Sequence, residues 1–345
     1  MRNGRRKKNN HSGLLKILLF VVIFVGAAVF FGRERTQEEE EFTWLEGSML
    51  AIGDLQVDYR EGMVYLHAVR MDYEQHYGSD IWQYAVDSHG NRMGDLIKEE
   101  VLEQMIYIKV VCEKADEQGL VLSEEEWQRV DAQTLEFMNK IQESELSFYG
   151  VNSEIVRRIY ADNMLAQKMF EVSTINVDTE VSTEEAKQHR FQALAIRNFK
   201  IDSSGARVSY EGEEADALVA KMWDLREQAV NASDFYKFAA ANTDDPTMLE
   251  FVGGKGDFPE SYGGRILAMK TGEISGVVTT QDYHYIFYCV NEYDVDETLK
   301  VKEKVIAQRK EEEFRRLYGK WRNTFRIRIN DTVWDSLDFY MKSAG

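Results

Sequence analysis

Proline, cysteine and histidine are scarce in this chain, whose 345 residues include two Pro, two Cys and six His. Neither the cysteines nor the histidines show the spacing of metal ligands. Acidic residues also outnumber basic ones, which gives a formal net charge of −18. A surface that acidic repels phosphate backbones. We therefore expect no metal, no cofactor and no nucleic-acid partner.

The N-terminal segment differs in charge from the rest of the chain. Residues 1–37 carry eight Lys and Arg and one Glu, a net charge of +7, so the remainder carries −25. A hydrophobic stretch follows at 13–32, and about 20 apolar residues suffice to cross a bilayer. Because the basic residues come mostly before this stretch and an acidic run at 38–41 comes after it, the N-terminus should face the cytoplasm.

A cleaved signal peptide is the alternative for this segment, since the small residues at 26–28 could form a cleavage site. The apolar run continues past that site to Phe31, which favours an uncleaved anchor. We expect a single-pass protein of the cell membrane with its bulk outside the cytoplasm. Its first three parts are a basic tail at 1–12, a transmembrane helix at 13–32 and an acidic linker at 33–48.

Helical periodicity dominates the chain from residue 59 to about residue 174, after one short strand expected at 49–57. In the second helix, Cys112 falls on an apolar stripe with spacings of four and three. Cys112 is therefore expected to be a small buried hydrophobe rather than half of a disulfide with the distant Cys289. The four predicted helices cover residues 59–77, 92–118, 123–141 and 152–173.

Cap and turn signals place several helix ends. Gly119 should end the second helix, and Ser123 with Glu126 forms a capping box for the third. A second capping box, Ser182 with Glu185, opens the region that follows. The later elements expected are a strand at 190–201, a polar loop at 203–212, helices at 213–230, 233–242 and 297–321, a strand containing Cys289, and a strand at 325–329.

Four short blocks follow an aromatic and alanine-rich helix between residues 234 and 290. They are a Thr-Asp-Asp loop, a Gly-Gly turn, a Gly-Glu-Ile-Ser turn and a closing strand that begins Tyr-His. This order resembles the parvulin family of peptidyl-prolyl cis-trans isomerases, whose substrate is the X-Pro bond. The blocks occupy residues 243–245, 253–254, 272–275 and 283–284.

Residues 96–127 are similar to the helical module of one parvulin group, the extracytoplasmic foldases and chaperones of the PrsA and SurA type. In that group a late helix folds back onto the module, and residues 297–321 fill this place. The resemblance implies an α+β fold in which a helical chaperone module accompanies a parvulin-like domain with an antiparallel sheet and surrounding helices. The implied domains are the helical module at 49–180, the parvulin-like domain at 181–295, and a C-terminal helix and strand at 296–345 that pack back on the module.

The resemblance also implies the site residues. Parvulins place two histidines and a Cys or Asp behind the amide, with a Met and a Phe lining a proline slot. The histidine of the closing strand matches His284, and the Cys or Asp matches Asp245, with Asp244 as the alternative one residue earlier. The slot residues fall at Phe258 and Tyr262, which differ from the family but keep bulk and largely apolar character.

The other family histidine has no match. The strand at 190–201 offers Ala193 or Leu194 at that position, and His189 lies several residues earlier, near the expected end of a helix. Loss of one polar group from such a network weakens catalysis without abolishing substrate binding.

Each site residue has a purely structural alternative. His284 could be a hydrogen-bonded core histidine between two tyrosines. Asp245 precedes a proline and could cap a turn. Phe258 and Tyr262 could be ordinary core residues, and the glycines of the blocks could serve only the backbone.

Two functions follow from these residues. X-Pro isomers differ by about 1 kcal/mol but interconvert over tens to hundreds of seconds, so a catalyst needs an apolar slot and polar groups that favour the twisted amide. We expect a membrane-anchored foldase that binds unfolded secreted polypeptides and accelerates this isomerisation. The alternative is a catalytically weak or inactive holdase on the same fold. A third possibility is a scaffold for one partner.

Overall fold

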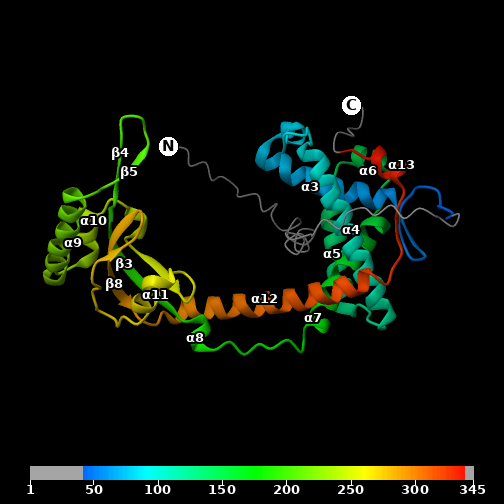
Figure 1. Cartoon of the computed structure of the whole chain (residues 1–345). Helices are drawn as coiled ribbons and strands as arrows, with labels where there is room; N and C mark the ends of the chain where they lie inside the picture. Colours follow the sequence, from blue (N-terminus) through cyan, green and yellow to red (C-terminus); the bar gives the residue numbers. More distant parts are fainter. Residues whose placement is uncertain (1–41, 339–345) are drawn as a thin grey trace, which may run out of the picture. The chain divides into compact units, whose positions relative to one another are not determined.

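The computed structural model describes residues 42–338, which fall into two compact units (Figure 1). Among the described residues, unit 1 combines 42–177 with 310–338, and unit 2 is Asp178–Arg309. The predicted basic tail, the transmembrane helix at 13–32 and most of the acidic linker lie outside the described residues. From residue 42 to residue 338, no helix is long and apolar enough to cross a membrane.

The sheet of unit 1 brings together two ends of the described chain. β1 (Ser48–Ile52) pairs antiparallel with both β2 (Leu55–Asp58) and β9 (Ile327–Ile329), giving the order β2-β1-β9. The single strand expected at 49–57 is wrong, because Gly53 adopts φ +58° and turns the chain back into a hairpin. β9 is half-buried and lies within the strand predicted at 325–329.

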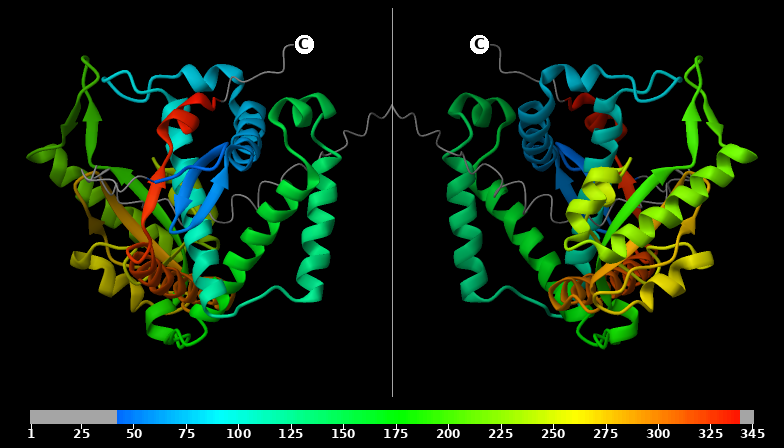
Figure 2. Two further views of the ribbon diagram at one scale, coloured as in Figure 1. Left: turned by 90° about the vertical axis from the view of Figure 1, so that its right-hand side faces the viewer. Right: turned by 90° about the vertical axis from the view of Figure 1, so that its left-hand side faces the viewer.

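Helices form the rest of unit 1. α3 (Tyr59–Tyr77), α4 (Met93–Glu117) and α7 (Ser153–Ser173) bury a shared apolar core, and α7 packs against both α4 and α5 (Figure 2). All four predicted helices are present, with ends that differ by no more than a few residues. Unit 1 also contains the part of α12 (Val295–Arg322) from Lys310 onward, whose Phe314 is fully buried against α4 and α7. Its other helices are η1 (Ser79–Gln83), α5 (Glu124–Met138), the unpredicted α6 (Glu143–Tyr149) and α13 (Asp331–Ser336).

The predicted end signals of unit 1 are confirmed. Ser123 Oγ accepts from Glu126 N at 3.3 Å, and Glu126 Oε2 accepts from Ser123 N at 2.6 Å, so each residue caps the other. Gly119 follows α4 with φ +67°, a backbone conformation that favours glycine. Cys112 is a buried free thiol in α4, as expected for a small core hydrophobe, and Cys289 is likewise buried and free in unit 2.

Unit 2 is built on a four-stranded antiparallel sheet of order β6-β3-β8-β7. The strand predicted at 190–201 is wrong in its length, because the sheet strand stops before Asn198. The chain then leaves the sheet as a separate two-stranded ribbon, so the predicted polar loop at 203–212 contains a strand. The strands are β3 (Gln188–Arg197), β4 (Phe199–Ile201), β5 (Arg207–Ser209), β6 (Phe251–Gly254), β7 (Val278–Thr279) and β8 (Tyr283–Asn291).

Helices cover both faces of this sheet (Figure 1). On one face, α9 (Glu213–Asn231) and α10 (Phe235–Asn242) pack on the even-numbered residues of β3 and β8. On the other face lies α11 (Glu260–Leu267), which the sequence patterns did not predict. The short α8 (Thr183–Ala186) begins at the predicted Ser182 cap, whose Oγ accepts from Glu185 N at 3.1 Å.

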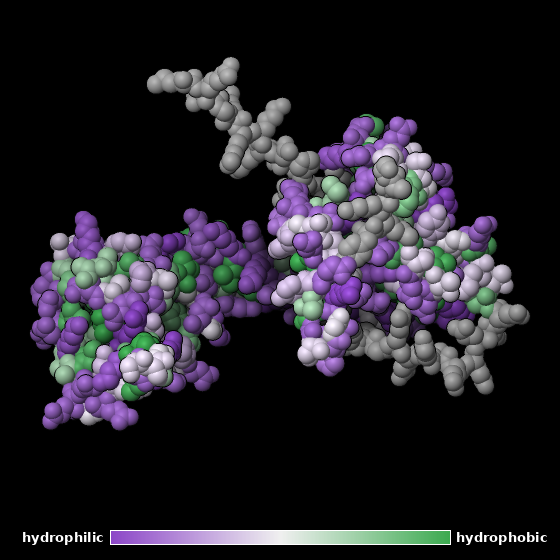
Figure 3. Space-filling model, turned by 90° about the horizontal axis from the view of Figure 1, so that it is seen from above, coloured by the Kyte–Doolittle hydropathy of each residue, from purple (hydrophilic) through white to green (hydrophobic). Residues whose placement is uncertain are grey.

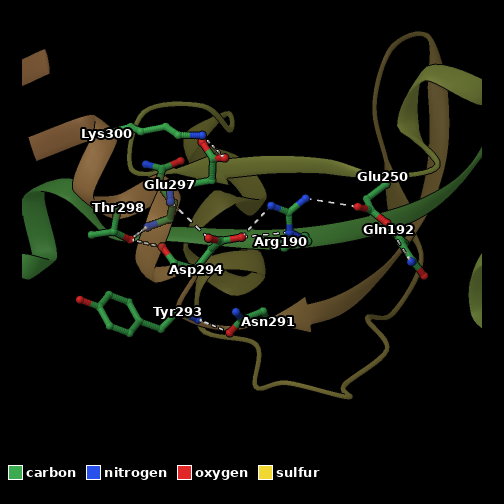
Figure 4. Close-up of polar contacts among 10 residues, drawn as sticks. Arg190, Gln192, Glu250, Asn291, Tyr293, Asp294, Glu297, Thr298 and Lys300 are labelled. Carbon is green, nitrogen blue, oxygen red and sulfur yellow. Dashed lines mark hydrogen bonds and ion pairs between the residues drawn. The ribbon is translucent and has the colours of Figure 1, made fainter. Parts of the chain in front are cut away.

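A polar network fixes the point where β8 ends and α12 (Val295–Arg322) begins (Figure 4). Asp294 Oδ1 accepts from Glu297 N at 3.2 Å, which caps the helix. Its Oδ2 accepts from Arg190 Nε at 2.9 Å, and its backbone N donates to Gln188 O at 2.8 Å. The start of α12 is thereby tied to β3.

Candidate functional site

An aromatic face covers one side of the sheet in unit 2, beneath and beside α11. We define it as the five rings that meet there. Phe287 is the central ring, 1% exposed, and it lies 5.4–6.3 Å from each of the other four ring centroids. Those four rings are each half-buried, so the face presents apolar surface to solvent. The aromatic face consists of Phe251, Phe258, Tyr262, Tyr285 and Phe287.

Glycines make room for the ring of Phe258. A Cβ on Gly253 would lie 2.9 Å from that ring, and a Cβ on Gly263 would lie 2.9 Å from the Cβ of Phe258. Real Cβ atoms do not approach so closely, so both positions require glycine while the ring stays in place. The Gly-Gly block and α11 therefore position Phe258. Tyr262 lies in the first turn of α11, with its ring centroid 6.3 Å from that of Phe258.

Strand alternation separates His284 from the aromatic face. The rings of Tyr283, Tyr285 and Phe287 follow one another at 5.7 and 5.4 Å, so they share a face. Neighbouring residues of a strand point to opposite sides, so the His284 side chain leaves β8 on the side of Ile286. Of the five predicted site residues, the structure brings Phe258 and Tyr262 together. It places the His284 side chain on the opposite side of β8 from the aromatic face.

Both ring nitrogens of His284 have partners. Nε2 lies 3.2 Å from Asn198 Oδ1, and Nδ1 lies 2.8 Å from Thr279 Oγ1. Because Asn198 Oδ1 can only accept, Nε2 carries the proton and Nδ1 accepts from the threonine hydroxyl in the neutral ring. Burial lowers the pKa of His284, which keeps the ring neutral near pH 7.

The Thr-Asp-Asp loop is bound to the edge of β3. Thr243 Oγ1 accepts from Ala195 N at 3.1 Å, and Asp244 N donates to Ala195 O at 2.8 Å. The Asp244 carboxylate accepts from Arg197 N at 3.0 Å. Asp245 Oδ1 accepts from both the backbone N and the hydroxyl of Thr247, so this aspartate does cap the turn that follows it.

Tyr285 is the residue of this site that the sequence interpretation missed. It belongs to the aromatic face and is half-buried. Burial, the neighbouring Tyr262 and Tyr283, and the negative charge of Asp245 raise the pKa of Tyr285 to about 12. The phenol therefore stays protonated across the physiological range. The period-two alternation of the closing strand was the signal that could have placed it beside Phe287.

No histidine of β3 contributes an imidazole to the exposed part of the aromatic face. Ala193 is fully buried and pairs with Phe287, and Ala195 is fully buried and pairs with Tyr285. His189 lies within β3 rather than at a helix end, so that expectation is wrong. It is 3% exposed and stacks on Phe191 at 5.5 Å. Burial lowers the pKa of His189, so this imidazole is a neutral core group.

The site is suited to binding and not to covalent chemistry. Within residues 42–338, no group of three or more His, Cys, Asp or Glu side chains is placed to hold a metal ion. What the site presents is apolar ring surface, two phenol groups and the nearby carboxylate of Asp245. Such a surface can hold an apolar side chain or a proline ring while hydroxyl groups donate to a peptide.

Sequence comparisons relate the chain to foldases. No protein-family model matches the chain. Foldase protein PrsA of Caldanaerobacter subterraneus subsp. tengcongensis is 22% identical over 216 residues, which cover 61% of this chain and 62% of that protein. Foldase protein PrsA of Clostridium botulinum strain Langeland is 25% identical over 252 residues, which cover 67% and 73%. The chain is similar to PrsA-type foldases. It spans less than two thirds of the first relative's length.

Solved structures of the same type are distant in shape. PrsA from Bacillus cereus, described as a peptidylprolyl isomerase, gives a TM-score of 0.35 at 13% identity, over 75% of this chain and 97% of that chain. The foldase protein PrsA from Streptococcus pneumoniae gives 0.32 at 16% identity, over 72% and 96%.

Proposed function

We propose that the chain is a membrane-anchored extracytoplasmic foldase that binds unfolded secreted polypeptides and accelerates the isomerisation of their X-Pro bonds. The observation that carries the proposal is the half-exposed aromatic face of unit 2, with the Asp245 carboxylate close enough to influence its phenol. The sequence similarity to PrsA foldases supports it.

Isomerisation of an X-Pro bond needs no covalent intermediate, only a surface that binds the peptide and polar groups that stabilise the twisted amide. The barrier to peptide rotation is about 18–20 kcal/mol and comes from amide resonance. An apolar surface that holds the proline ring also removes water from the amide, and groups that favour the twisted state over the planar state lower the barrier. The aromatic face provides the apolar surface, and its phenol groups with the nearby Asp245 carboxylate provide the polar groups.

The roles of the predicted residues follow from their places. Phe258 and Tyr262 would contact the proline ring or the residue before it. Of the two carboxylates that raise the pKa of Tyr285, Asp245 has the larger effect, whereas Asp244, the alternative, is engaged by the backbone of Arg197. His284 would act indirectly. Its hydrogen bonds to Thr279 and Asn198 would hold β8 in place beside the residues that contact the peptide.

The anchor and the domain roles complete the proposal. The hydrophobic stretch at 13–32 would hold the chain in the cell membrane with residues 1–12 in the cytoplasm. Residues 49–180 with 296–345 would form the chaperone module, and residues 181–295 the parvulin-like domain. Secreted chains would then meet the foldase as they leave the membrane.

A holdase without isomerase activity is the second candidate, and the absence of a β3 imidazole from the exposed part of the aromatic face favours it. Apolar residues are also exposed singly, as on most protein surfaces. In unit 1, Leu135 is 63% and Ile175 73% exposed, and in unit 2, Trp223 is 48% exposed. Hydrophobic residues also lie between hydrophilic ones across the surface drawn in Figure 3. Such surface can hold unfolded segments without any chemistry.

A proline-limited refolding assay with the full chain in detergent micelles separates the two candidates. We expect the wild type to accelerate the slow phase, and Asp245→Asn to lose most of that gain because it removes the charge but keeps the acceptor for Thr247. Asp244→Asn tests the alternative position in the same assay.

Binding is tested by Tyr262→Ala, with Tyr236→Ala as the control because Tyr236 is an exposed tyrosine of α10, on the other side of the sheet. If the wild type leaves the slow phase unchanged but raises the yield of soluble client, the isomerase proposal fails and the holdase remains. If neither changes, both functions are excluded.

A further inference from the structure

Tyr285 lies where its side chain can contact a peptide bound to the aromatic face. Its ring stacks on Phe287 at 5.4 Å with an interplanar angle of 24°, so the ring orientation is fixed by the core of the aromatic face. The side chain is half-buried, so part of it remains open to a bound peptide. It lies on the same side of the sheet as Phe258 and Tyr262, the proposed contacts of the proline ring.

The residues opposite Tyr285 contribute no polar side-chain atoms. Tyr285 pairs with Ala195 across the β3–β8 ladder, and Phe287 pairs with Ala193. Both alanines are fully buried. Hydrogen-bond donors to a peptide on this side can therefore come from the tyrosines, from backbone N–H groups of the loop at 243–245, or from Arg197, an exposed residue of β3 on the same side of the sheet. His284 cannot supply one there, because both of its ring nitrogens are engaged behind the strand.

A phenol suits the twisted amide. In the planar peptide the nitrogen lone pair is delocalised into the carbonyl, so the nitrogen accepts no hydrogen bond. On twisting, the lone pair localises and becomes an acceptor. A donor aimed at the prolyl nitrogen therefore stabilises the twisted state and not the planar one, which is the condition for catalysis.

We infer that Tyr285 is a catalytic residue of this site. Its phenolic hydroxyl donates a hydrogen bond to the prolyl nitrogen of the twisted X-Pro bond. The inference rests on the proposed isomerase function. No proton is transferred, so the hydroxyl is unchanged after each turnover. The burial that raises the pKa of Tyr285 keeps it a donor at every physiological pH.

The first test is Tyr285→Phe in the full chain, assayed on a proline-containing peptide. The variant keeps the stacked ring and loses only the hydroxyl, so we expect kcat/KM to fall about tenfold, as for the loss of one hydrogen bond made in the transition state. Peptide affinity, measured by tyrosine fluorescence, should stay the same. The matched control is Tyr288→Phe, because Tyr288 lies on the same strand but stacks on Phe235 on the other side of the sheet.

A second test needs no variant. If the phenol is the donor, the wild-type rate should stay level from about pH 6 to pH 9, since the donor titrates only near its raised pKa. A rate that changes below pH 6.5, in step with a histidine, overturns the inference. So does a Tyr285→Phe variant with the wild-type rate, or a loss seen with Tyr262→Phe instead. A wild type with no isomerase activity overturns both the inference and the isomerase proposal, whereas these other outcomes overturn the inference alone.

Discussion

Unit 1 buries charged side chains among its helices, whereas unit 2 fills one face of its sheet with aromatic rings. In unit 1, Lys109 Nζ lies 2.7 Å from Glu61 Oε2 and 2.5 Å from Asp162 Oδ2, and the Lys109 and Glu61 side chains are 6% and 3% exposed. In unit 2, the residues around Phe287 are apolar or phenolic. The core of unit 1 thus includes paired charge beside its apolar residues, whereas this part of unit 2 consists of packed rings.

The difference has a physical meaning. Burial alone would lower the pKa of Lys109, but Asp162 and Glu61 together raise it above its ordinary value, so this lysine stays charged in the core. A buried ion pair gives little net stability but is costly to break, because the remaining partner keeps a buried charge. The aromatic face has no such dependence and can stay partly open to a ligand.

Lys109→Met should have the largest effect and would sharpen the comparison. It leaves Asp162 and Glu61 without their shared lysine, although Arg158 Nη2 still lies 2.7 Å from Glu61 Oε1. We therefore expect the free energy of unfolding of unit 1 to fall by about 3–4 kcal/mol, toward the low end for a broken buried pair. Hydrogen exchange read separately for peptides of each unit should show the loss in unit 1 and little change within unit 2.

The control is Lys140→Met, which breaks an exposed pair with Glu136 and should cost less than about 1 kcal/mol. An equally small loss for Lys109→Met would mean that charge does not hold unit 1 together.

Acid should act on unit 1 through His67. Burial lowers the pKa of His67 to about 4, with Glu145 opposing and Arg70 adding to the shift. The unfolded chain binds this proton near pH 6.5, so stability is full above that pH and falls as the pH drops toward 4, by up to about 3 kcal/mol.

Urea unfolding from pH 7 to pH 4 measures this loss. His67→Gln should flatten the pH dependence of unit 1, while His76→Gln, at an exposed site, should not. His284 and His189 have lowered pKa values too, so unit 2 loses stability in the same direction and keeps this dependence in His67→Gln. The comparison breaks if His67→Gln leaves the pH profile of unit 1 unchanged.

Phe287→Leu should have the smallest effect of the three and tests the other side of the comparison. The change keeps an apolar side chain but removes the ring at the centre of the aromatic face. Aromatic pairs contribute about 0.5–1.5 kcal/mol each beyond their buried area, so we expect unit 2 to lose about 2 kcal/mol after partial repacking.

Denaturant unfolding, with hydrogen exchange to assign the loss to unit 2, would measure it. Phe148→Leu is the control, because Phe148 is 47% exposed in unit 1. A loss as small as that of the control would show that ring packing is not what holds the sheet.

Local signals predicted helices better than they predicted strands. α3 begins and ends at the residues expected from its periodicity, and the Ser123 and Ser182 caps form the bonds that their spacing predicts. These elements depend on residues three or four apart. The pairing of β1 with β9 and the break at Asn198 depend on partner strands distant in sequence, and neither was predicted. The hairpin of β1 and β2 was missed although its turn at Gly53 is local.

The candidate site shows the same limit. The blocks led to Phe258 and Tyr262, which do meet in the aromatic face. The resemblance implied catalytic roles for both His284 and Asp245. In the structure His284 is engaged by Thr279 and Asn198, and Asp245 by Thr247. Strand alternation places Tyr285 on the same side of β8 as Phe287, but only the packed sheet shows that this side faces α11.

The sequence by itself determined the long helices, the Ser123 and Ser182 caps, the burial of both cysteines and the order of the blocks in unit 2. These follow from periodicity, hydrophobicity and backbone chemistry within a few residues. Only the tertiary structure decided which side of β8 faces α11, which charges are buried together, and which hydroxyl stands beside Phe287. Those outcomes require residues far apart in the chain to meet, because strand register and helix packing are set by the whole core and not by any local pattern.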